Sequence, residues 1–167
     1  GWTADGPIEP GALSTAGAYC VSPLARLAAM DGETRFLAAA CGLLESYWQE
    51  FGRDLRAPYW GGTIDAGAED KEAGFGVLRG ALDVFEASGD RKWLEIARDA
   101  ADWTLTWMYF FDVDLPPGTV LSGKLRSVGW TFISTQNQEI DVFGYWMAPD
   151  YYRLGVAAGD ERYRAIG

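Results

Sequence analysis

A five-residue turn sequence that occurs three times constrains the fold of this chain more than any other feature. It consists of a glycine, an acid, any residue, a base and an aromatic residue, and it occupies positions 32–36, 89–93 and 159–163. A glycine can end one helix in the left-handed conformation, the acid can cap the next helix, and the aromatic residue can begin the buried face of that next helix. The repetition predicts an all-α array of helical hairpins.

The repeat extends far upstream when each turn glycine is used as a zero mark. Position −15 is a glycine in all three copies, and position −5 is apolar; two copies also share a glutamate at −20 and a tryptophan at −29. A glycine inside a helix costs roughly 1 kcal/mol relative to alanine, so three at the same depth predict close approach of a neighbouring backbone or a ligand. The residues concerned are Gly17, Gly74 and Gly144; Leu27, Val84 and Leu154; Glu69 and Glu139; and Trp60 and Trp130.

We expect five complete helices and the start of a sixth. The leading helix of each hairpin spans about 13–30, 68–87 and 137–157, and the trailing helices span 33–51, 91–111 and 161 onward. Pro23 and Pro149 should break the leading helices locally, because proline removes a backbone donor. The short sixth helix predicts a single helical domain over residues 1–167, with hairpins at about 12–51, 68–111 and 137–167, that is part of a larger toroid.

Composition argues against several classes of protein. The 167 residues carry a formal net charge of −10 without a cluster of Lys and Arg, so nucleic acid and anionic membranes are unfavourable partners. No apolar run reaches the roughly 20 residues of a membrane helix. The chain contains no histidine, which excludes Ser-His-Asp and Cys-His catalysis and histidine-ligated zinc. Cys20 and Cys41 are expected to be buried free thiols, and we expect no metal and no cofactor.

Polar residues that can carry chemistry are concentrated in segments 59–72 and 129–141. Each segment has an aromatic residue, an extended stretch and carboxylates that open a leading helix, so both sets are expected at the same end of the array. Paired carboxylates can divide the roles of acid and base or nucleophile, while aromatic rings stack on sugars and amides bind hydroxyl groups. The candidate catalytic residues are Asp65, Glu69, Glu139 and Asp141, and the candidate substrate-binding residues are Tyr59, Trp60, Trp130, Gln136, Asn137 and Gln138.

A structural role is the alternative for each carboxylate. Acids in the first turn of a helix are favoured by the helix dipole, and Asn137 or its neighbours can serve as a cap. Asp65 is the exception, because it lies in a glycine-rich loop ahead of the helix. Asp141 is expected one turn into its helix, either at the lip of a pocket or as a buried, paired acid.

Four further charged positions in the second long connection fit weaker hypotheses. Asp112 and Asp114 could bind calcium, but two acids without further oxygen ligands fit a solvated loop better. Lys124 and Arg126 could bind a substrate carboxylate, as in uronic acids, although a surface role fits both better.

The pattern resembles the (α/α) toroid superfamily of six-hairpin glycosidase-like proteins. The resemblance covers essentially the whole chain and rests on the three turns, the leading-helix glycines and the two Trp/Glu pairs; segments 61–65 and 136–138 are also similar to uncharacterised bacterial glycoside-hydrolase-like sequences. It implies an inner ring of helices inside an outer ring, with substrate bound where the inner helix ends and their loops meet. Three hairpins correspond to a partial toroid. No catalytic signature of a characterised family matches residue by residue.

The expected function is that of a carbohydrate-active toroid segment, glycoside-hydrolase-like, that acts on oligo- or polysaccharide through paired carboxylates. The alternative is a non-catalytic helical repeat module that binds glycan or protein through the same aromatic loops. A terpene cyclase is a weaker alternative, because Asp65, Glu69 and Asp70 do not form a tight magnesium-binding cluster. Self-association through the apolar flanks of the outer hairpins is also expected. The compartment stays open, with a slight preference for the cytoplasm because no signal peptide is visible.

Overall fold

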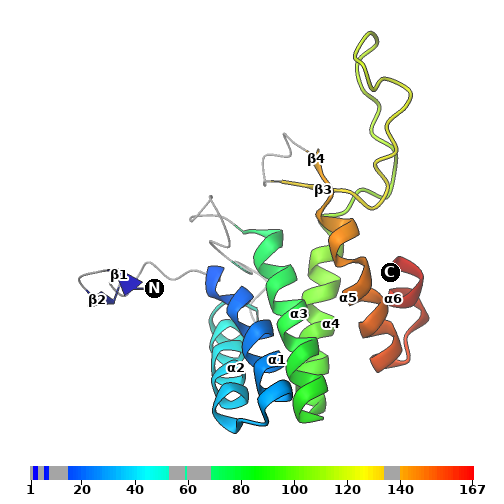
Figure 1. The fold of residues 1–167 in the computed structure, drawn as a ribbon. Helices are drawn as coiled ribbons and strands as arrows, with labels where there is room; N and C mark the ends of the chain where they lie inside the picture. Colours follow the sequence, from blue (N-terminus) through cyan, green and yellow to red (C-terminus); the bar gives the residue numbers. More distant parts are fainter. Residues whose placement is uncertain (1, 4–5, 8–14, 53–58, 60–68, 134–139) are drawn as a thin grey trace.

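The structure is a computed structural model that describes residues 2–3, 6–7, 15–52, 59, 69–133 and 140–167. The described part is mostly helical and contains three helical hairpins (Figure 1). Two short antiparallel strand pairs and two short helices of other types accompany them. The elements are β1 (Trp2–Thr3), β2 (Gly6–Pro7), η1 (Ala16–Cys20), α1 (Val21–Asp31), α2 (Thr34–Tyr47), η2 (Trp48–Gly52), α3 (Lys71–Ser88), α4 (Arg91–Leu105), β3 (Thr131–Phe132), β4 (Ile140–Asp141), α5 (Phe143–Ala158) and α6 (Glu161–Ile166).

The three repeated turns connect the helices as the sequence predicts. Each turn glycine ends its helix in the left-handed conformation, with φ between 67° and 71°. In the second turn, the Asp90 side chain accepts a hydrogen bond of 3.0 Å from the backbone N–H of Lys92. The third turn is capped in the same way, whereas Glu33 of the first turn makes no side-chain cap. The prediction of helical hairpins is therefore confirmed.

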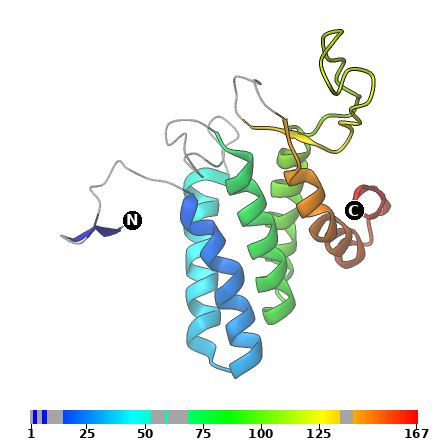
Figure 2. The same cartoon turned by 45° about the horizontal axis from the view of Figure 1, so that its top comes forward.

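The leading helices α1, α3 and α5 lie side by side, and the trailing helices pack behind them (Figures 1 and 2). The three glycine turns lie at one end of this array, and the connection from α4 to β3 lies at the other. The N-terminal ends of α3 and α5 are at this second end, which we name the loop end. This arrangement brings the beginning of α3 and the strand ahead of α5 together at the loop end.

The middle hairpin is the most buried part of the molecule. One hydrophobic cluster contains side chains from α1 to α6, and Phe75, Leu78 and Leu82 of α3 are at most 1% exposed. Among the described residues, every exposed large apolar side chain on an α-helix lies on α1, α5 or α6. The outer hairpins therefore present apolar surface that the middle hairpin does not. These exposed side chains are Leu27, Met30, Tyr145, Trp146, Tyr152, Val156 and Ile166.

The glycines at position −15 lie at tight approaches, as predicted. A Cβ atom on Gly74 would lie 2.7 Å from the methyl group of Thr104 in α4. A Cβ atom on Gly144 would collide with the backbone carbonyl of Gly129, and Gly17 is packed in the same way against a side chain of α2. The close neighbour in each case is another part of the chain.

The leading helices begin later than the sequence pattern predicts. α3 begins at Lys71, because Asp70 caps it by accepting a hydrogen bond of 2.8 Å from the backbone N–H of Glu72. The chain ahead of α5 forms β4, so α5 begins at Phe143 and not near residue 137. The first leading helix changes from η1 to α1 just before Pro23. α5 runs through Pro149 without being split, contrary to expectation.

The connection after α4 begins earlier than predicted and projects from the loop end (Figure 1). Tyr109 donates a backbone hydrogen bond of 2.8 Å to Trp130 and accepts one of 2.8 Å from Gly129. β3 continues this pairing, because Thr131 bridges to Met108 on one side and β4 pairs with β3 on the other. The ladder fixes β4 at the loop end. In the described part of the chain, no helix is long and apolar enough to span a membrane.

Candidate functional site

A buried ammonium group at the loop end contacts two carboxylates. The side chain of Lys71, the first residue of α3, is 0% exposed. Its Nζ atom lies 2.9 Å from Oδ2 of Asp141 and 3.6 Å from Oε1 of Glu72. We refer to these three residues as the lysine cluster. It joins the start of α3 to the strand that leads into α5.

The ammonium is paired but not fully hydrogen-bonded. Within the described part of the chain, Nζ of Lys71 makes no directed hydrogen bond. The 2.9 Å contact with Asp141 is therefore an ion pair whose angles do not suit a hydrogen bond. Nζ also lies 5.2 Å from the centre of the Phe143 ring, which is a cation–π distance. A buried charge is costly unless it is paired and hydrogen-bonded. Such incompletely satisfied groups require an explanation, and a role in ligand binding or catalysis is one.

The corner between β4 and α5 fixes the carboxylate of Asp141. Its Oδ1 atom accepts a hydrogen bond from the hydroxyl of Thr131, which lies opposite it in the strand pair, and another of 3.0 Å from the backbone N–H of Phe143. Its second oxygen faces Lys71. The expectation that Asp141 lies inside a helix is wrong, because β4 precedes α5. Of its two expected positions, the structure shows the paired acid, 17% exposed.

Glu72 has a different environment from Asp141. Its side chain is 20% exposed, and burial raises the pKa of its carboxyl group; Lys71 opposes this rise, while the nearby charges of Asp70 and Asp141 add to it. The same ammonium therefore contacts one carboxylate held in an ion pair and a second one shifted toward its protonated form.

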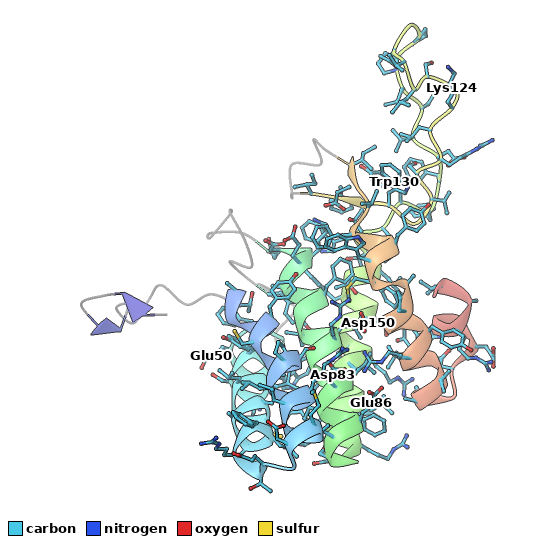
Figure 3. The ribbon with its side chains drawn as sticks, in the orientation of Figure 1. Glu50, Asp83, Glu86, Lys124, Trp130 and Asp150 are labelled. Atoms are coloured by element: carbon cyan, nitrogen blue, oxygen red, sulfur yellow. The ribbon has the colours of Figure 1, made fainter. Side chains whose placement is uncertain are left out.

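Aromatic side chains surround the lysine cluster on the α5 side. The Phe143 ring lies 5.2 Å from the ring of Trp146, which is 67% exposed. Trp130, at the loop end in Figure 3, packs edge-on against Tyr145 with ring centres 6.4 Å apart, and Tyr145 is itself 54% exposed. Flat apolar surfaces therefore lie close to the two carboxylates. This combination suits the binding of sugar rings.

Six of the predicted site residues lie outside the described residues, namely Asp65, Glu139, Trp60, Gln136, Asn137 and Gln138. Glu69 is half-buried and directly precedes the cap of α3, and Trp130 is half-buried. Tyr59 requires a correction, because it is 1% exposed and its ring packs 4.7 Å from that of Trp103. Its ring is part of the core and offers no face to a sugar. The thiol of Cys20 is exposed, contrary to expectation, and that of Cys41 is partly buried; both are free.

Lys71 and Glu72 were missed as site residues by the sequence reasoning, although a signal was present. Lys71 and Asp141 both lie 18 residues before their turn glycines, Gly89 and Gly159. Opposite charges at the same position of adjacent hairpins are placed at the same level of the array, here at the start of α3 and in the strand ahead of α5. The first turn of a helix also favours acids over bases, so a lysine there needs a partner.

The chain was compared with known proteins in three ways. No protein-family model, curated protein or solved structure matches it. A functional assignment therefore depends on the arrangement of its residues.

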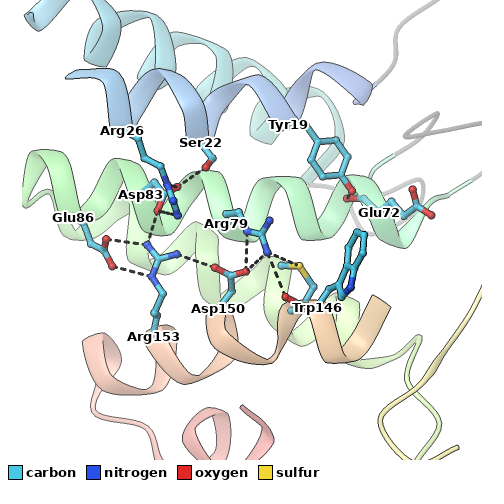
Figure 4. Close-up of polar contacts among 11 residues, drawn as sticks. Tyr19, Ser22, Arg26, Glu72, Arg79, Asp83, Glu86, Trp146, Asp150 and Arg153 are labelled. Atoms are coloured by element: carbon cyan, nitrogen blue, oxygen red, sulfur yellow. Dashed lines mark hydrogen bonds and ion pairs between the residues drawn. The ribbon is translucent and has the colours of Figure 1, made fainter. Parts of the chain in front are cut away.

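A second group of charges lies midway along the leading helices (Figures 3 and 4). Asp83 of α3, 4% exposed, accepts hydrogen bonds from Ser22 at 2.5 Å and from Nε of Arg26 at 2.9 Å, both on α1. Arg153 of α5 donates a third bond. Burial alone would raise the pKa of Asp83, but these three donors outweigh it and hold the pKa below its usual value.

Asp150 of α5 extends this group of charges. It accepts bonds of 2.9 and 2.8 Å from Arg79 of α3 and one of 2.8 Å from Arg153. Arg153 also pairs with Glu86 at 2.9 Å. We refer to the whole set as the arginine network: Ser22, Arg26, Arg79, Asp83, Glu86, Asp150 and Arg153. It connects all three leading helices.

The arginine network also follows the repeat. Arg26, Asp83 and Arg153 each lie six residues before a turn glycine, so their charges alternate across the three leading helices at one level. This alternation was not predicted either, although counting back from the turn glycines reveals it in the sequence.

The other candidate ligand sites are weaker. Arg126 donates a hydrogen bond of 2.6 Å to Asp112. This one bond engages both Arg126, a candidate for binding a substrate carboxylate, and Asp112, a candidate calcium ligand. Among the described residues, no group of three or more acids or cysteines is placed to hold a metal ion. The lysine cluster and the arginine network are therefore the two arrangements that merit a chemical interpretation.

Proposed function

We propose that this chain is a carbohydrate-active helical domain of glycoside-hydrolase-like type, with its sugar site at the loop end beside the lysine cluster. The observation that carries the proposal is the pair of unlike carboxylates on one buried ammonium. Burial raises the pKa of Glu72, whereas Asp141 is paired with Lys71 at 2.9 Å. Carboxyl groups whose environments differ in this way can supply the acid and the nucleophile of glycoside hydrolysis.

In the proposed mechanism, Glu72 donates its proton to the glycosidic oxygen that leaves, and a carboxylate oxygen of Asp141 attacks the anomeric carbon. Both carboxylate oxygens contact the same Nζ atom, at 2.9 and 3.6 Å, so they lie at most about 6.5 Å apart. Because about 6.5 Å is an upper limit, the separation cannot exceed the lower edge of the roughly 6.5–9.5 Å range of inverting enzymes, whereas it allows the roughly 5–5.5 Å of retaining enzymes. The proposed stereochemical outcome is therefore retention. Lys71 holds the nucleophile in place through its ion pair.

The remaining predicted residues belong to the same proposed site by their place in the sequence. Glu69 directly precedes the cap of α3, and Glu139 directly precedes β4. The exposed rings of Tyr145 and Trp146 and the half-buried ring of Trp130 supply surfaces on which sugar rings can stack. The proposed partner is an oligo- or polysaccharide.

The proposal includes a partial (α/α) toroid, in which α1, α3 and α5 form the inner layer. Three features support it: the same glycine turn in each hairpin, the separate layers of leading and trailing helices, and the exposed apolar side chains on the outer hairpins. The outer hairpins would pack against further hairpins or against a second copy of the chain.

The experiment that tests this function is a screen of the purified chain against a panel of polysaccharides, with release of reducing ends as the readout. We expect Glu72→Gln to lower kcat by at least about 100-fold, because the proton donor is lost, without a loss of thermal stability. Glu95→Gln, which changes an exposed glutamate on α4, is the matched control and should retain full activity. Proton NMR of the first-formed anomer tests retention. Full activity of Glu72→Gln would contradict the assignment.

A non-catalytic module that binds glycan or protein is the second candidate, and one observation favours it. Both oxygens of Asp141 are already engaged, one by Thr131 and the start of α5 and the other by Lys71. Such contacts are also those of a structural cap. Saccharide binding in calorimetry that is unchanged in Glu72→Gln, without release of reducing ends, would support the module.

A further inference from the structure

The arginine network lines an open groove of about 970 Å³ between α1, α3 and α5. Apolar side chains, among them Pro23, Met30 and Pro149, complete its lining. In Figure 4, Glu86 lies at one end of the network, and Trp146 and Tyr19 lie beyond Arg79 at the other, toward the loop end. We name this feature the arginine groove.

The charges of the arginine groove are not equally exposed. The side chains of Asp83 and Asp150 are each 4% exposed, whereas those of Arg26 and Arg79 are 61% and 38% exposed. Glu86 is the exposed acid of the groove, at the end away from Trp146. A ligand that enters from the Trp146 side therefore meets guanidinium groups above buried carboxylates, on a chain whose net charge is −10.

Two of these guanidinium groups retain unused donors. Arg79 uses Nε and Nη2 to bind Asp150, and Arg26 uses the same two nitrogens to bind Asp83. Within the described part of the chain, Nη1 of each makes no hydrogen bond. Arg153, in contrast, donates from all three nitrogens and is fully engaged. Arg79 and Arg26 are therefore the groups that can bind an added anion.

Exposed rings lie next to Arg79. Its Nη2 atom approaches the backbone oxygen of Trp146 at 3.5 Å, and the side chain of Trp146 is exposed. Tyr19, 40% exposed, donates a hydrogen bond of 2.7 Å to the backbone oxygen of Glu72. This end of the arginine groove is therefore the one that faces Glu72 of the lysine cluster.

We propose that the arginine groove binds the carboxylate groups of an acidic oligosaccharide, so that the substrate class is a uronate-containing glycan. This inference rests on the proposed carbohydrate function. One sugar carboxylate binds Nη1 of Arg79 while its ring packs on Trp146, and a second carboxylate further along the glycan binds Arg26. Hydrogen bonds between guanidinium and carboxylate are among the strongest that proteins make, because both groups are charged.

The acidic character of the whole chain does not prevent this binding. At physiological ionic strength the Debye length is about 8 Å, so acids on distant surfaces are largely screened. The buried carboxylates of the network are neutralised by the arginines that contact them. The affinity should fall as salt is added, because the arginines remain partly exposed.

Calorimetric titration with three probes tests the inference. The probes are tetragalacturonate, its fully methyl-esterified form, which keeps the rings and removes the charges, and hexaglutamate, which has carboxylates without sugar rings. We expect tetragalacturonate to bind at least about tenfold more tightly than the ester at low salt, because only the acid makes charge-assisted hydrogen bonds. Hexaglutamate should bind more weakly than tetragalacturonate.

Two variants and a matched control localise the effect. Arg79→Gln/Asp150→Asn removes one charge of each sign, and it should reduce the affinity for tetragalacturonate toward that of the ester, because only the contact with Arg26 remains. Glu33→Gln/Arg35→Gln removes an exposed pair, 2.5 Å apart, at the α1–α2 turn and should change nothing. Trp146→Ala changes an exposed side chain without risk to the core, and it should weaken both the acid and the ester.

Each other result overturns the inference. Equal affinity for acid and ester contradicts the acidic substrate class but leaves the carbohydrate function intact, whereas binding of neither form contradicts both. Hexaglutamate that binds as tightly as tetragalacturonate would indicate an anion site without sugar recognition. A dimer that buries the groove, detected by sedimentation and disrupted by Arg26→Glu, would assign the surface to a second copy of the chain.

Discussion

The lysine cluster and the arginine network both bury carboxylates beside cations, but they differ in how completely those charges are satisfied. In the network, Asp83 accepts bonds from three side chains, and its pKa is lowered. In the cluster, one ammonium contacts two carboxylates without a directed hydrogen bond, and the pKa of Glu72 is raised. The comparison teaches that the same kinds of residue can either fix helices in place or hold one carboxyl group close to protonation.

The two regions also share a principle of construction. Each places opposite charges at the same repeat position of adjacent hairpins, Lys71 with Asp141 in the cluster and Asp83 with Arg26 and Arg153 in the network. The network lies midway along the helices, where Asp83 of α3 finds cationic partners on both neighbouring helices, α1 and α5. The cluster lies at the loop end, beside the strand pair that precedes α5. In the proposed function, position along the helix separates a structural use of buried charge from a chemical one.

Removal of one charge from the arginine network should have the largest effect on stability. Asp83→Asn leaves Arg26 without its carboxylate partner and Arg153 with fewer, so we expect the free energy of unfolding to fall by about 3 kcal/mol. Urea denaturation at neutral pH measures this loss. Asp31→Asn, at an exposed aspartate of α1, is the control and should change stability by less than about 0.5 kcal/mol.

The pH dependence of this loss provides a second check. Because the pKa of Asp83 is lowered in the folded state, its contribution is present above the unfolded aspartate pKa of about 3.9 and is lost as the pH falls through the folded value. The difference between wild type and Asp83→Asn should therefore shrink toward zero in acid. A difference that is independent of pH would indicate a packing effect.

A change of the same kind in the lysine cluster should have a smaller effect. Lys71→Met leaves Asp141 without its cation, but the two carboxylates are 17% and 20% exposed and can be partly hydrated. We expect a loss of about 2 kcal/mol, most of which Lys71→Met/Asp141→Asn should recover, because that double variant removes both charges of the 2.9 Å ion pair together. A double-mutant cycle by urea denaturation measures the coupling. Equal instability of the single and double variants would show that the ion pair is not what holds this corner.

The hairpin architecture was predictable because its determinants are local. A glycine with positive φ and an acid at the next N-cap act within a few residues, and the turns at Gly32, Gly89 and Gly159 therefore revealed where helices end. The starts of α3 and α5 were predicted too early. They depend on Asp70 as a cap and on the pairing of β4 with β3, and the second of these is not local in sequence.

The candidate site could be predicted only in part. Of the predicted carboxylates that the structure describes, Glu69 and Asp141 lie at the same end of the array, as expected, and Asp141 belongs to the lysine cluster. Tyr59 was misassigned, because an aromatic residue beside a glycine-rich loop gives no sign of whether its ring faces solvent or Trp103. Lys71 was not predicted, because only carboxylates were considered as catalytic groups. A buried carboxylate such as that of Asp141 also needs a cation beside it.

The smallest expected effect concerns Glu72 and tests the chemical side of the comparison most directly. Because burial raises its pKa in the folded state, Glu72 favours folding below the unfolded glutamate pKa of about 4.3 and loses that contribution as the pH rises through the folded value. Glu72→Gln should therefore match wild type in acid and exceed its stability at neutral pH, by less than about 1 kcal/mol because the group is partly exposed.

Thermal unfolding between pH 3 and pH 8 measures this difference, with Glu161→Gln, at an exposed glutamate of α6, as the control that should show no crossover. If Glu72→Gln were less stable than wild type at neutral pH, its ion pair with Lys71 would outweigh burial. The lysine cluster would then resemble the buried carboxylates of the arginine network, which hold the leading helices together. The proposed proton donor would lose its physical basis, and the non-catalytic module would become the better account of this chain.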